Sequence, residues 1–230
     1  LTSYVPPTGN SIAYCWNSVN DAVINTDGTT PSQVSADSKS GFSVVTYNGT
    51  GQNATVGHGL DKAPEFIVVK CTNSTAGTNY FPVYSQPVFD NASNQSLYLN
   101  NADAAFNSAD MFNSTAPTNS VFSLGTNVQS NSSSGTYVAY CWTSIPGFSA
   151  VGSYTGNGNA DGPFIYTGHK SAFVLIKSST SAQNWVIYDS ARSPYNPNNA
   201  YLFPNDAAAE PTNNRPIDLL SNGFKIRINA

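Results

Sequence analysis

The chain has 230 residues, of which only 10% are charged and 12% are aromatic, and its formal net charge is −4. Asparagine, serine and threonine, with 28, 30 and 20 copies, supply most of the polar surface, while the aromatic residues give enough volume for a core. Nine basic residues against 13 acidic ones leave no positive stripe for a nucleic acid. No apolar run approaches the roughly 18 residues of a membrane-spanning helix. We therefore expect a folded chain with no nucleic-acid partner and no membrane insertion.

The N-terminal region carries an apolar and aromatic run, Ala13-Tyr14-Cys15-Trp16, that returns as Ala139-Tyr140-Cys141-Trp142. Runs of this kind, bounded by Gly, Asn and Ser, are typical of β-strands. We expect residues 1–20 to hold a closing strand homologous to 136–145. The polar stretch 21–40 is expected to be a linker or loop.

From residue 41 onward, five landmarks occur twice in the same order, at an offset that stays between 102 and 107 residues. The pairs are Gly41–Val45 with Gly147–Val151, Phe66–Lys70 with Phe173–Lys177, Tyr80–Ser85 with Trp185–Ser190, Tyr98–Ala105 with Tyr201–Ala208, and Val121–Leu124 with Gly223–Ile226. In the third and loosest pair, Tyr84 aligns with Tyr188. This order indicates an internal duplication.

Each landmark is a short apolar or aromatic run between turn-forming residues, which is typical of antiparallel sandwiches. The only helical periodicity is a turn or two around Ile217–Leu220. The predicted fold is all-β, with two tandem homologous antiparallel β-sandwich modules of jelly-roll or concanavalin-like type. The first module spans 41–145, and the second spans 146–230 and lacks its last strand.

A module without its last strand has an open sheet edge, which attracts another strand. The N-terminal segment marked by Ile12, Tyr14 and Trp16 is the candidate for this position. Three arrangements stay open: the segment completes the second module within one chain, it is donated to the next subunit, or the chain is a piece of a longer array.

Catalytic residues are not expected. The only glutamates, Glu65 and Glu210, do not recur between the copies, whereas a carboxylate pair is what sugar-cleaving sandwiches need. Asp103 and Asp206 do recur, but an Asp before Ala-Ala is typical of a turn. We predict no enzymatic activity and no cofactor.

A metal site is not expected either. The three cysteines show no metal-ligand spacing and are interpreted as buried free thiols. The run Asn157-x-Asn159-x-Asp161-Gly162 is similar to the start of a calcium loop, but its twelfth position is Gly168 instead of a bidentate Glu. A hairpin rich in Gly and Asn is therefore the favoured interpretation.

Glycan binding is the functional chemistry that fits this composition. Aromatic faces stack on sugar rings, and neutral amides and hydroxyls bond sugar hydroxyls. Trp16, Trp142 and Trp185 lie within repeated strands and are assigned to the core. The candidate ligand-binding residues in and beside loops are Tyr47, Asn48, Tyr154, Asn157, Asn159, Asp161 and Tyr195.

The ordered motifs also carry a resemblance to a known kind of module. They are Gly-His-Gly-Leu at 57–60, Ala-Pro-Glu-Phe-Ile-Val-Val-Lys at 63–70, Ser-Thr-Ala-Pro-Thr at 114–118, Tyr-Val-Ala-Tyr-Cys-Trp at 137–142, Gly-Ser-Tyr-Thr-Gly-Asn-Gly at 152–158, Asp-Gly-Pro-Phe-Ile-Tyr-Thr-Gly at 161–168 and Ile-Tyr-Asp-Ser-Ala-Arg at 187–192. From about Ile12 onward the chain resembles a repeated β-sandwich module of unknown function found in virion structural proteins of tailed bacteriophages, especially those of marine bacteria and cyanobacteria. This resemblance identifies no catalytic or ligand-binding residue in this chain.

The resemblance implies a virion-surface, extracellular location and a non-enzymatic role in a tail fibre, an appendage or a capsid decoration. The expected partners are further copies of the chain, other virion proteins and a host-surface glycan. The alternative is a bacterial cell-surface adhesin or a lectin-like carbohydrate-binding module, strand-swapped into filaments.

Overall fold

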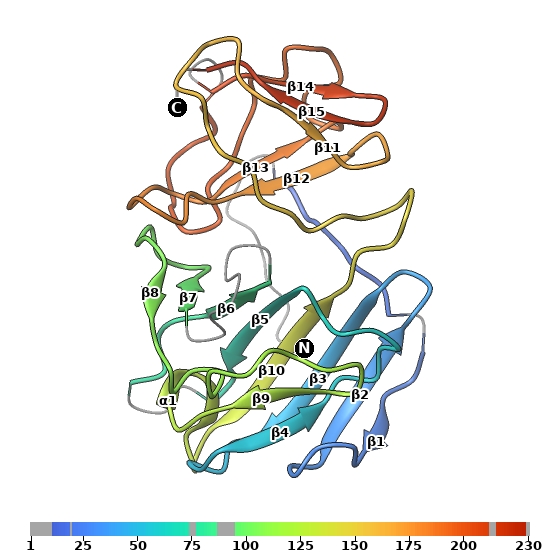
Figure 1. Ribbon diagram of the computed structural model, residues 1–230, viewed down its shortest axis with the longest axis vertical. Coiled ribbons are helices and arrows are strands. Elements are labelled where there is room, and N and C mark those ends of the chain that lie inside the picture. The colour runs from blue at the N-terminus through green and yellow to red at the C-terminus, as the bar shows by residue number, and fades with distance from the viewer. Residues whose placement is uncertain (1–10, 19, 74–76, 87–94, 212–214, 229–230) are drawn as a thin grey trace.

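Figure 1 shows a computed structural model of the chain, which describes residues 11–18, 20–73, 77–86, 95–211 and 215–228. Its regular structure is almost entirely antiparallel β-strand, so the predicted all-β class is confirmed. The strands form two layered units, one above the other in the view of Figure 1.

The first unit contains the largest sheet of the described chain, with eight strands. In spatial order they are β1 (Val23–Asn25), β2 (Ser32–Asp37), β3 (Phe42–Asn48), β10 (Thr136–Trp142), β5 (Phe66–Cys71), β6 (Pro82–Ser85), β7 (Gln95–Tyr98) and β8 (Phe106–Asn107). A second layer holds β4 (Ala54–Gly57), β9 (Val121–Leu124) and the short helix α1 (Val128–Asn131). Alternate residues point inward, so Val45, Ile67 and Ala139 from the sheet meet Val56 and Phe122 in a fully buried core.

The second unit is built from two smaller sheets that face each other across their own core. One sheet is β11 (Phe164–Tyr166), β15 (Gly223–Ile226) and β14 (Ile217–Leu220), and the other is β12 (Phe173–Ile176) with β13 (Val186–Asp189). Their inner faces bury Val174, Tyr188, Tyr201, Ile217 and Phe224.

A third apolar cluster joins the two units. Trp185 from the second unit lies among Val68, Val83 and Leu97 of the large sheet, and its indole Nε1–H donates to the carbonyl oxygen of Tyr98 at 2.8 Å. Two more hydrogen bonds cross the same boundary, from Lys177 Nζ to the Ala102 carbonyl and from the Ala105 amide to the Ser179 carbonyl. The outer face of one sheet thus serves as packing surface for the other unit.

Equivalent strand pairs in the two units have the same register at the sequence landmarks. Phe66 lies opposite Ser85 in the β5–β6 pair, and Phe173 lies opposite Asp189 in the β12–β13 pair. Ile67 opposite Tyr84 matches Val174 opposite Tyr188 in the same way.

The β4–β9 pair has a counterpart as well. Val56 lies opposite Phe122 there, while in the β11–β15 pair Ile165 lies opposite Phe224. Phe122 and Phe224 are the residues that the internal alignment superimposes.

Three expectations about elements are wrong. Residues 21–40, expected as a linker or loop, contain β1 and β2 of the large sheet. The segment around Ile217–Leu220 is a strand instead of a helical turn. Gly147–Val151, aligned with the start of β3, forms no strand, although Ile145 and Ser149 make an isolated bridge there.

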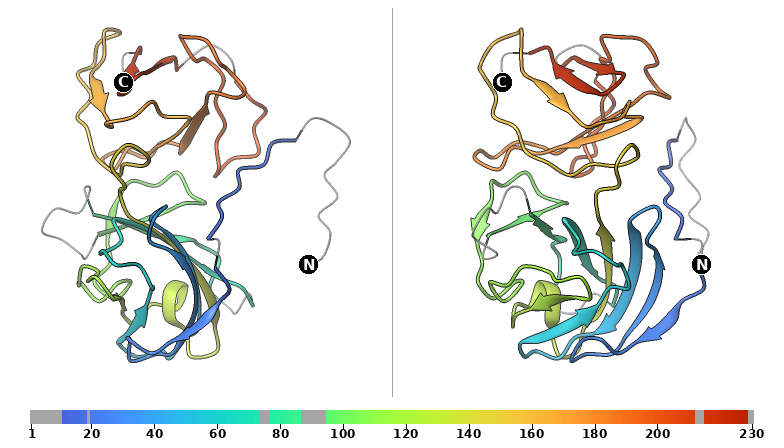
Figure 2. Two further views of the ribbon diagram at one scale, coloured as in Figure 1. Left: turned by 90° about the vertical axis from the view of Figure 1, so that its right-hand side faces the viewer. Right: turned by 45° about the vertical axis from the view of Figure 1, so that its right-hand side comes forward.

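The N-terminal segment contacts the second unit through side chains. Residues 11–18 form no strand, and residues 1–10 and 19 of the expected closing strand lie outside the described residues. Tyr14 donates its hydroxyl hydrogen to Asp189 Oδ2 at 2.7 Å, and the Trp16 ring lies 5.5 Å from that of Phe173. Trp16 is nevertheless 48% exposed and Cys15 is exposed, so the prediction that they are buried is wrong, because the segment contacts the second unit on one side only. Figure 2 shows this segment leaving the large sheet and running beside the second unit.

Candidate ligand-binding face

The largest exposed aromatic side chains of the second unit gather on its edge strand β11 and in its loops. On β11 the middle residue, Ile165, packs against the core, so Phe164 and Tyr166 point to the opposite side. Their exposed fractions are 46% and 71%. Side chains two residues apart on a strand project from the same side of the sheet, so the two rings share one face.

Neighbouring strands complete this outer face. Lys225 of β15 lies opposite Phe164, and Asp218 of β14 lies opposite Lys225. Gly223 lies opposite Tyr166, and a Cβ atom there would come within 2.9 Å of the Phe164 ring and 2.1 Å of the Ile165 carbonyl oxygen. Glycine is therefore required for the rings and the backbone to lie this close.

Charged side chains on this face neutralise one another. Lys225 Nζ lies 2.9 Å from Asp161 Oδ1, and Arg227 lies 2.5 Å from Asp218 Oδ2 and 3.8 Å from Asp161. The hydrogen bond from Lys225, followed by its charge, lowers the pKa of Asp161 below its usual value, so this carboxylate is ionised at neutral pH. Two acids and two bases then leave the face neutral overall. We call the set Phe164, Tyr166, Asp161, Lys225, Arg227 and Asp218 the β11 face.

The predicted loop residues lie at one border of the β11 face. Asn157 Oδ1 accepts from the backbone N–H of Asn159 at 3.1 Å, and Asn159 Oδ1 accepts from that of Asp161 at 2.9 Å. These side chains form consecutive Asx turns that lead into β11. The oxygen atoms that a calcium loop would point at a metal thus accept backbone hydrogen bonds. Within the described residues, no group of three or more His, Cys, Asp or Glu side chains is arranged for a metal.

The remaining predicted ligand residues do not share one site. Tyr47 was expected at the surface, but it is only 4% exposed and its ring stacks on that of Tyr137 at 5.3 Å. Its side chain points to the inner face of β3, as that of Val45 does, and so it lies in the core. Tyr154 is 39% exposed and lies edge-on to Phe224, whereas Tyr195 is 83% exposed in the loop after β13.

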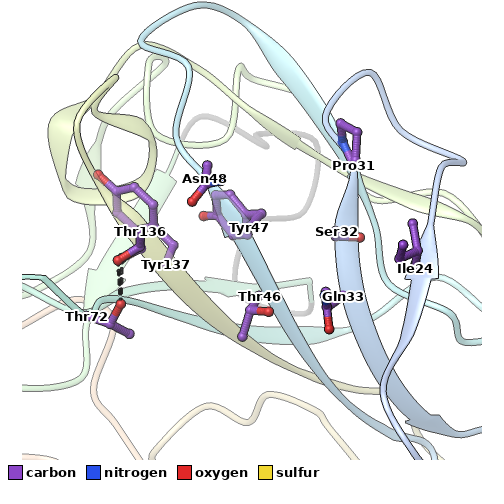
Figure 3. Close-up of a pocket in the computed structure, with 10 residues that line it drawn as sticks. All are labelled: Ile24, Pro31, Ser32, Gln33, Thr46, Tyr47, Asn48, Thr72, Thr136 and Tyr137. Carbon is purple, nitrogen blue, oxygen red and sulfur yellow. Dashed lines mark hydrogen bonds between the residues drawn. The ribbon is translucent and has the colours of Figure 1, made fainter.

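Asn48 borders a separate hollow of about 450 Å³ at one end of the large sheet (Figure 3). Its walls are mostly hydroxyl and amide side chains, including Gln33 and Thr46, and Thr72 and Thr136 share a hydrogen bond of 2.7 Å there. The aromatic rings in the wall are buried, so neither offers a free face for stacking. A sugar in this hollow would therefore have polar partners and the aliphatic side chain of Ile24 but no aromatic ring on which to stack. The hollow is therefore a weaker candidate than the β11 face.

Both glutamates are engaged in structural contacts. Glu65 Oε2 accepts hydrogen bonds from the Ser144 amide, at 2.8 Å, and from the Ser144 hydroxyl. Glu210 Oε1 pairs with Arg192 at 2.5 Å, and Arg192 also bonds Asp189. The structure thus gives each glutamate a role in holding loops.

Sequence reasoning located the border of the β11 face but missed its aromatic centre. The sequence predicts Asn157, Asn159 and Asp161 as ligand-binding residues, but not Phe164 and Tyr166. The signal was present in the alternation Phe-Ile-Tyr, because one buried Ile between two aromatics predicts that both rings point outward. Proximity to turns instead favours exposure of Tyr47, Tyr154 and Tyr195.

Comparisons with known proteins identify the family. No helix within the described ranges is long and apolar enough to span a bilayer. Searches of curated proteins and of solved structures gave no match. One family model, described as a domain of unknown function (DUF7483), matches residues 4–230 and so covers both units. The chain therefore belongs to the DUF7483 family.

Proposed function

We propose that this protein is a non-enzymatic structural protein of a bacteriophage virion surface, in a tail fibre, an appendage or a capsid decoration, and that its β11 face binds a neutral glycan of the host surface. The virion context rests on the sequence motifs that resemble phage structural modules. The equal strand registers of the two units support a duplicated building block. Its copies associate with one another and with other virion proteins.

The observation that carries the binding role is the exposed pair Phe164 and Tyr166 on a face whose charges cancel. A pyranose ring has an apolar face that stacks on an aromatic ring, and its hydroxyls bond carboxylates and amides at the edge. Asp161, whose side chain is 79% exposed, has free lone pairs for this purpose. A face without surplus positive charge gives an anionic polymer no electrostatic gain, so a neutral sugar is the better match.

The test is a glycan array probed with the purified chain, followed by titration of the best ligand. The double variant Phe164→Ala/Tyr166→Ala is expected to weaken binding about tenfold or more, because each stacked ring contributes about 0.5–1.5 kcal/mol. Its melting temperature should change little, since both side chains are exposed.

Phe148→Ala is the matched control, because Phe148 is 63% exposed and lies in a turn outside the β11 face. It should bind as the wild type does. Equal losses in both variants, or no ligand on the array, would contradict the binding role. Release of reducing sugar from a bound polysaccharide, abolished by Glu65→Gln or Glu210→Gln, would contradict the non-enzymatic role.

A further inference from the structure

One edge of β12 has no backbone partner among the described residues. β12 pairs with β13 through its other edge. The equivalent strand of the first unit, β5, pairs on both sides, with β6 and with β10. The matching registers of β5–β6 and β12–β13 thus define where a counterpart of β10 would lie, directly beside β12.

The chain contains a second copy of the sequence that fills this position in the first unit. β10 ends in Ala139-Tyr140-Cys141-Trp142, and residues 13–16 have the same four residues. In β10, Trp142 lies opposite Phe66, and their rings are 5.6 Å apart. Trp16 lies 5.5 Å from Phe173, the residue aligned with Phe66. Trp16 therefore already contacts Phe173, the residue that it would face if the N-terminal segment paired with β12 in the way that β10 pairs with β5.

Within one chain, however, the segment does not adopt that register. If it followed β10, Tyr14 would lie opposite Leu175, as Tyr140 lies opposite Val68. Instead, the Tyr14 hydroxyl bonds Asp189, the residue opposite Phe173. Its ring also lies 5.1 Å from that of Phe173, so Tyr14 and Trp16 both crowd one end of β12.

A tether explains this position. Ser18 and Asn20 are bonded to Ser35 and Ala36 of β2 in the first unit. Trp16 is two residues from Ser18, and two residues span at most about 7 Å. The segment is thereby held to the first unit immediately after Trp16, and no residue of the described ranges pairs with the free edge of β12.

We propose that the free edge of β12 takes the segment Ala13–Trp16 of a second copy of this chain as an antiparallel strand, with Trp16 opposite Phe173, Cys15 opposite Val174 and Tyr14 opposite Leu175. A strand from another copy is anchored to the first unit of its own chain and not to that of the copy that receives it, and it satisfies the unpaired backbone groups of the edge. Reciprocal exchange gives a closed dimer, and one-way donation gives a chain of subunits. This strand exchange is the contact by which copies of the chain associate, and so it rests on the self-association included in the proposed function. It is tested without any ligand.

The proposed register is tested by crosslinking the variant Val174→Cys through the native Cys15. Residues directly opposite on antiparallel strands have Cβ atoms about 4.5–5.5 Å apart, close enough for a disulfide after small adjustments. Cys15 is exposed, whereas Cys71 and Cys141 are buried. Mild oxidation should give a covalent dimer or ladder on a non-reducing gel, and the mass spectrum should contain the peptide of Cys15 joined to the peptide that carries the introduced cysteine.

Two controls make the result specific. Leu175→Cys lies next to the target but points to the other face of β12, towards the cluster around Trp185, and should not crosslink. Val174→Cys combined with Cys15→Ser should not crosslink either. A disulfide that joins Cys15 to the introduced cysteine within a single chain, or no disulfide at all, would overturn the proposal.

A second measurement avoids the core position Val174. Light scattering should give the wild-type chain a mass of two or more copies at micromolar concentration, and Tyr14→Ala/Trp16→Ala should reduce it to one. Tyr195→Ala, at an exposed aromatic outside the segment, should keep the wild-type mass. A wild type that is monomeric at every concentration, or a double variant that keeps the larger mass, would also overturn the proposal. Neither result alters the expectation for the glycan array.

Discussion

At the scale of single residues, His58 is a fully buried titratable side chain. It is 0% exposed, and its Nδ1 accepts the Leu60 backbone N–H at 3.1 Å. Its Nε2 lies 3.1 Å from the Thr118 carbonyl oxygen, which only accepts, so Nε2 carries the hydrogen and the ring is neutral. Burial lowers the pKa of His58 below its usual value of 6.5.

This arrangement predicts a stability that depends on pH. The unfolded chain takes up a proton near pH 6.5, whereas the folded chain resists it to a lower pH. The contribution of His58 is therefore fully present above about pH 6.5 and is lost as the pH falls through the lowered pKa of the folded state. Urea unfolding at a series of pH values from 7.5 to about 5 should show this fall in the free energy of unfolding.

His58→Gln should be less stable at pH 7.5 but should lose this part of the pH dependence. The matched control is His169→Gln, because the chain has only two histidines and His169 is partly exposed. The control should keep the wild-type slope. An unchanged slope in His58→Gln would show that another group causes the acid sensitivity.

At the scale of elements, strands with apolar residues on both faces were predictable, whereas β1 and β2 at one side of the large sheet were not. β5 and β12 are continuous apolar runs, because Ile67 and Val174 face the core of their own unit while Val68 and Leu175 face the cluster around Trp185. β2 carries the polar residues Gln33, Ser35 and Asp37 on its outward face, so its composition is that of a loop, and β1 has only two apolar residues, Val23 and Ile24, which are too few to form a recognisable run. Their pairing depends on β3, which the local sequence does not report.

Two shorter segments show the same limit. Ile217-Asp218-Leu219-Leu220 is too short to separate a helical period from a strand period. Pairing with β15 decides it, and Asp218 points outward to Arg227. Tyr47 borders a turn rich in Gly and Asn, which favours exposure, but its position two residues after Val45 places it in the core. The same limit applies to the candidate site. Its Asn and Asp residues are recognisable from their residue type as turn formers, whereas the outward direction of its aromatic rings follows only from the alternation of side chains along β11.

A hydrogen bond to Asp189 of β13 holds the N-terminal segment, residues 11–18, against the second unit. Burial alone would raise the pKa of the Asp189 carboxyl group, but hydrogen bonds from Tyr14 and Arg192 outweigh burial and lower this pKa. In the single chain, where Tyr14 contacts its own Asp189, Tyr14→Phe should therefore expose residues 11–18 to protease more readily, since it removes one hydrogen bond to a charged group, about 1.5–3 kcal/mol in magnitude. Limited proteolysis followed by mass spectrometry checks this. Tyr195→Phe is the control, and equal cleavage rates in the two variants would contradict the role of the Tyr14 hydroxyl.

At the scale of the whole molecule, Trp185 is expected to make the two units unfold together. Its side chain is 2% exposed, lies among residues of the large sheet and donates to the Tyr98 carbonyl. Replacing such a residue by Ala typically costs about 3–5 kcal/mol. Because the second unit is small and has its own core, loss of this anchor should let it melt at a lower temperature than the first unit.

Differential scanning calorimetry should thus show one transition for the wild type and two for Trp185→Ala. Trp185→Phe keeps the apolar contact with Phe66, whose ring lies 6.4 Å from the indole, but loses the hydrogen bond to the Tyr98 carbonyl. It should keep a single transition at a moderately lower temperature, because the hydrogen bond contributes about 1 kcal/mol while the packing carries the coupling between the units. Two transitions already in the wild type, or one unshifted transition in Trp185→Ala, would mean that the cohesion of the units comes from elsewhere in their interface.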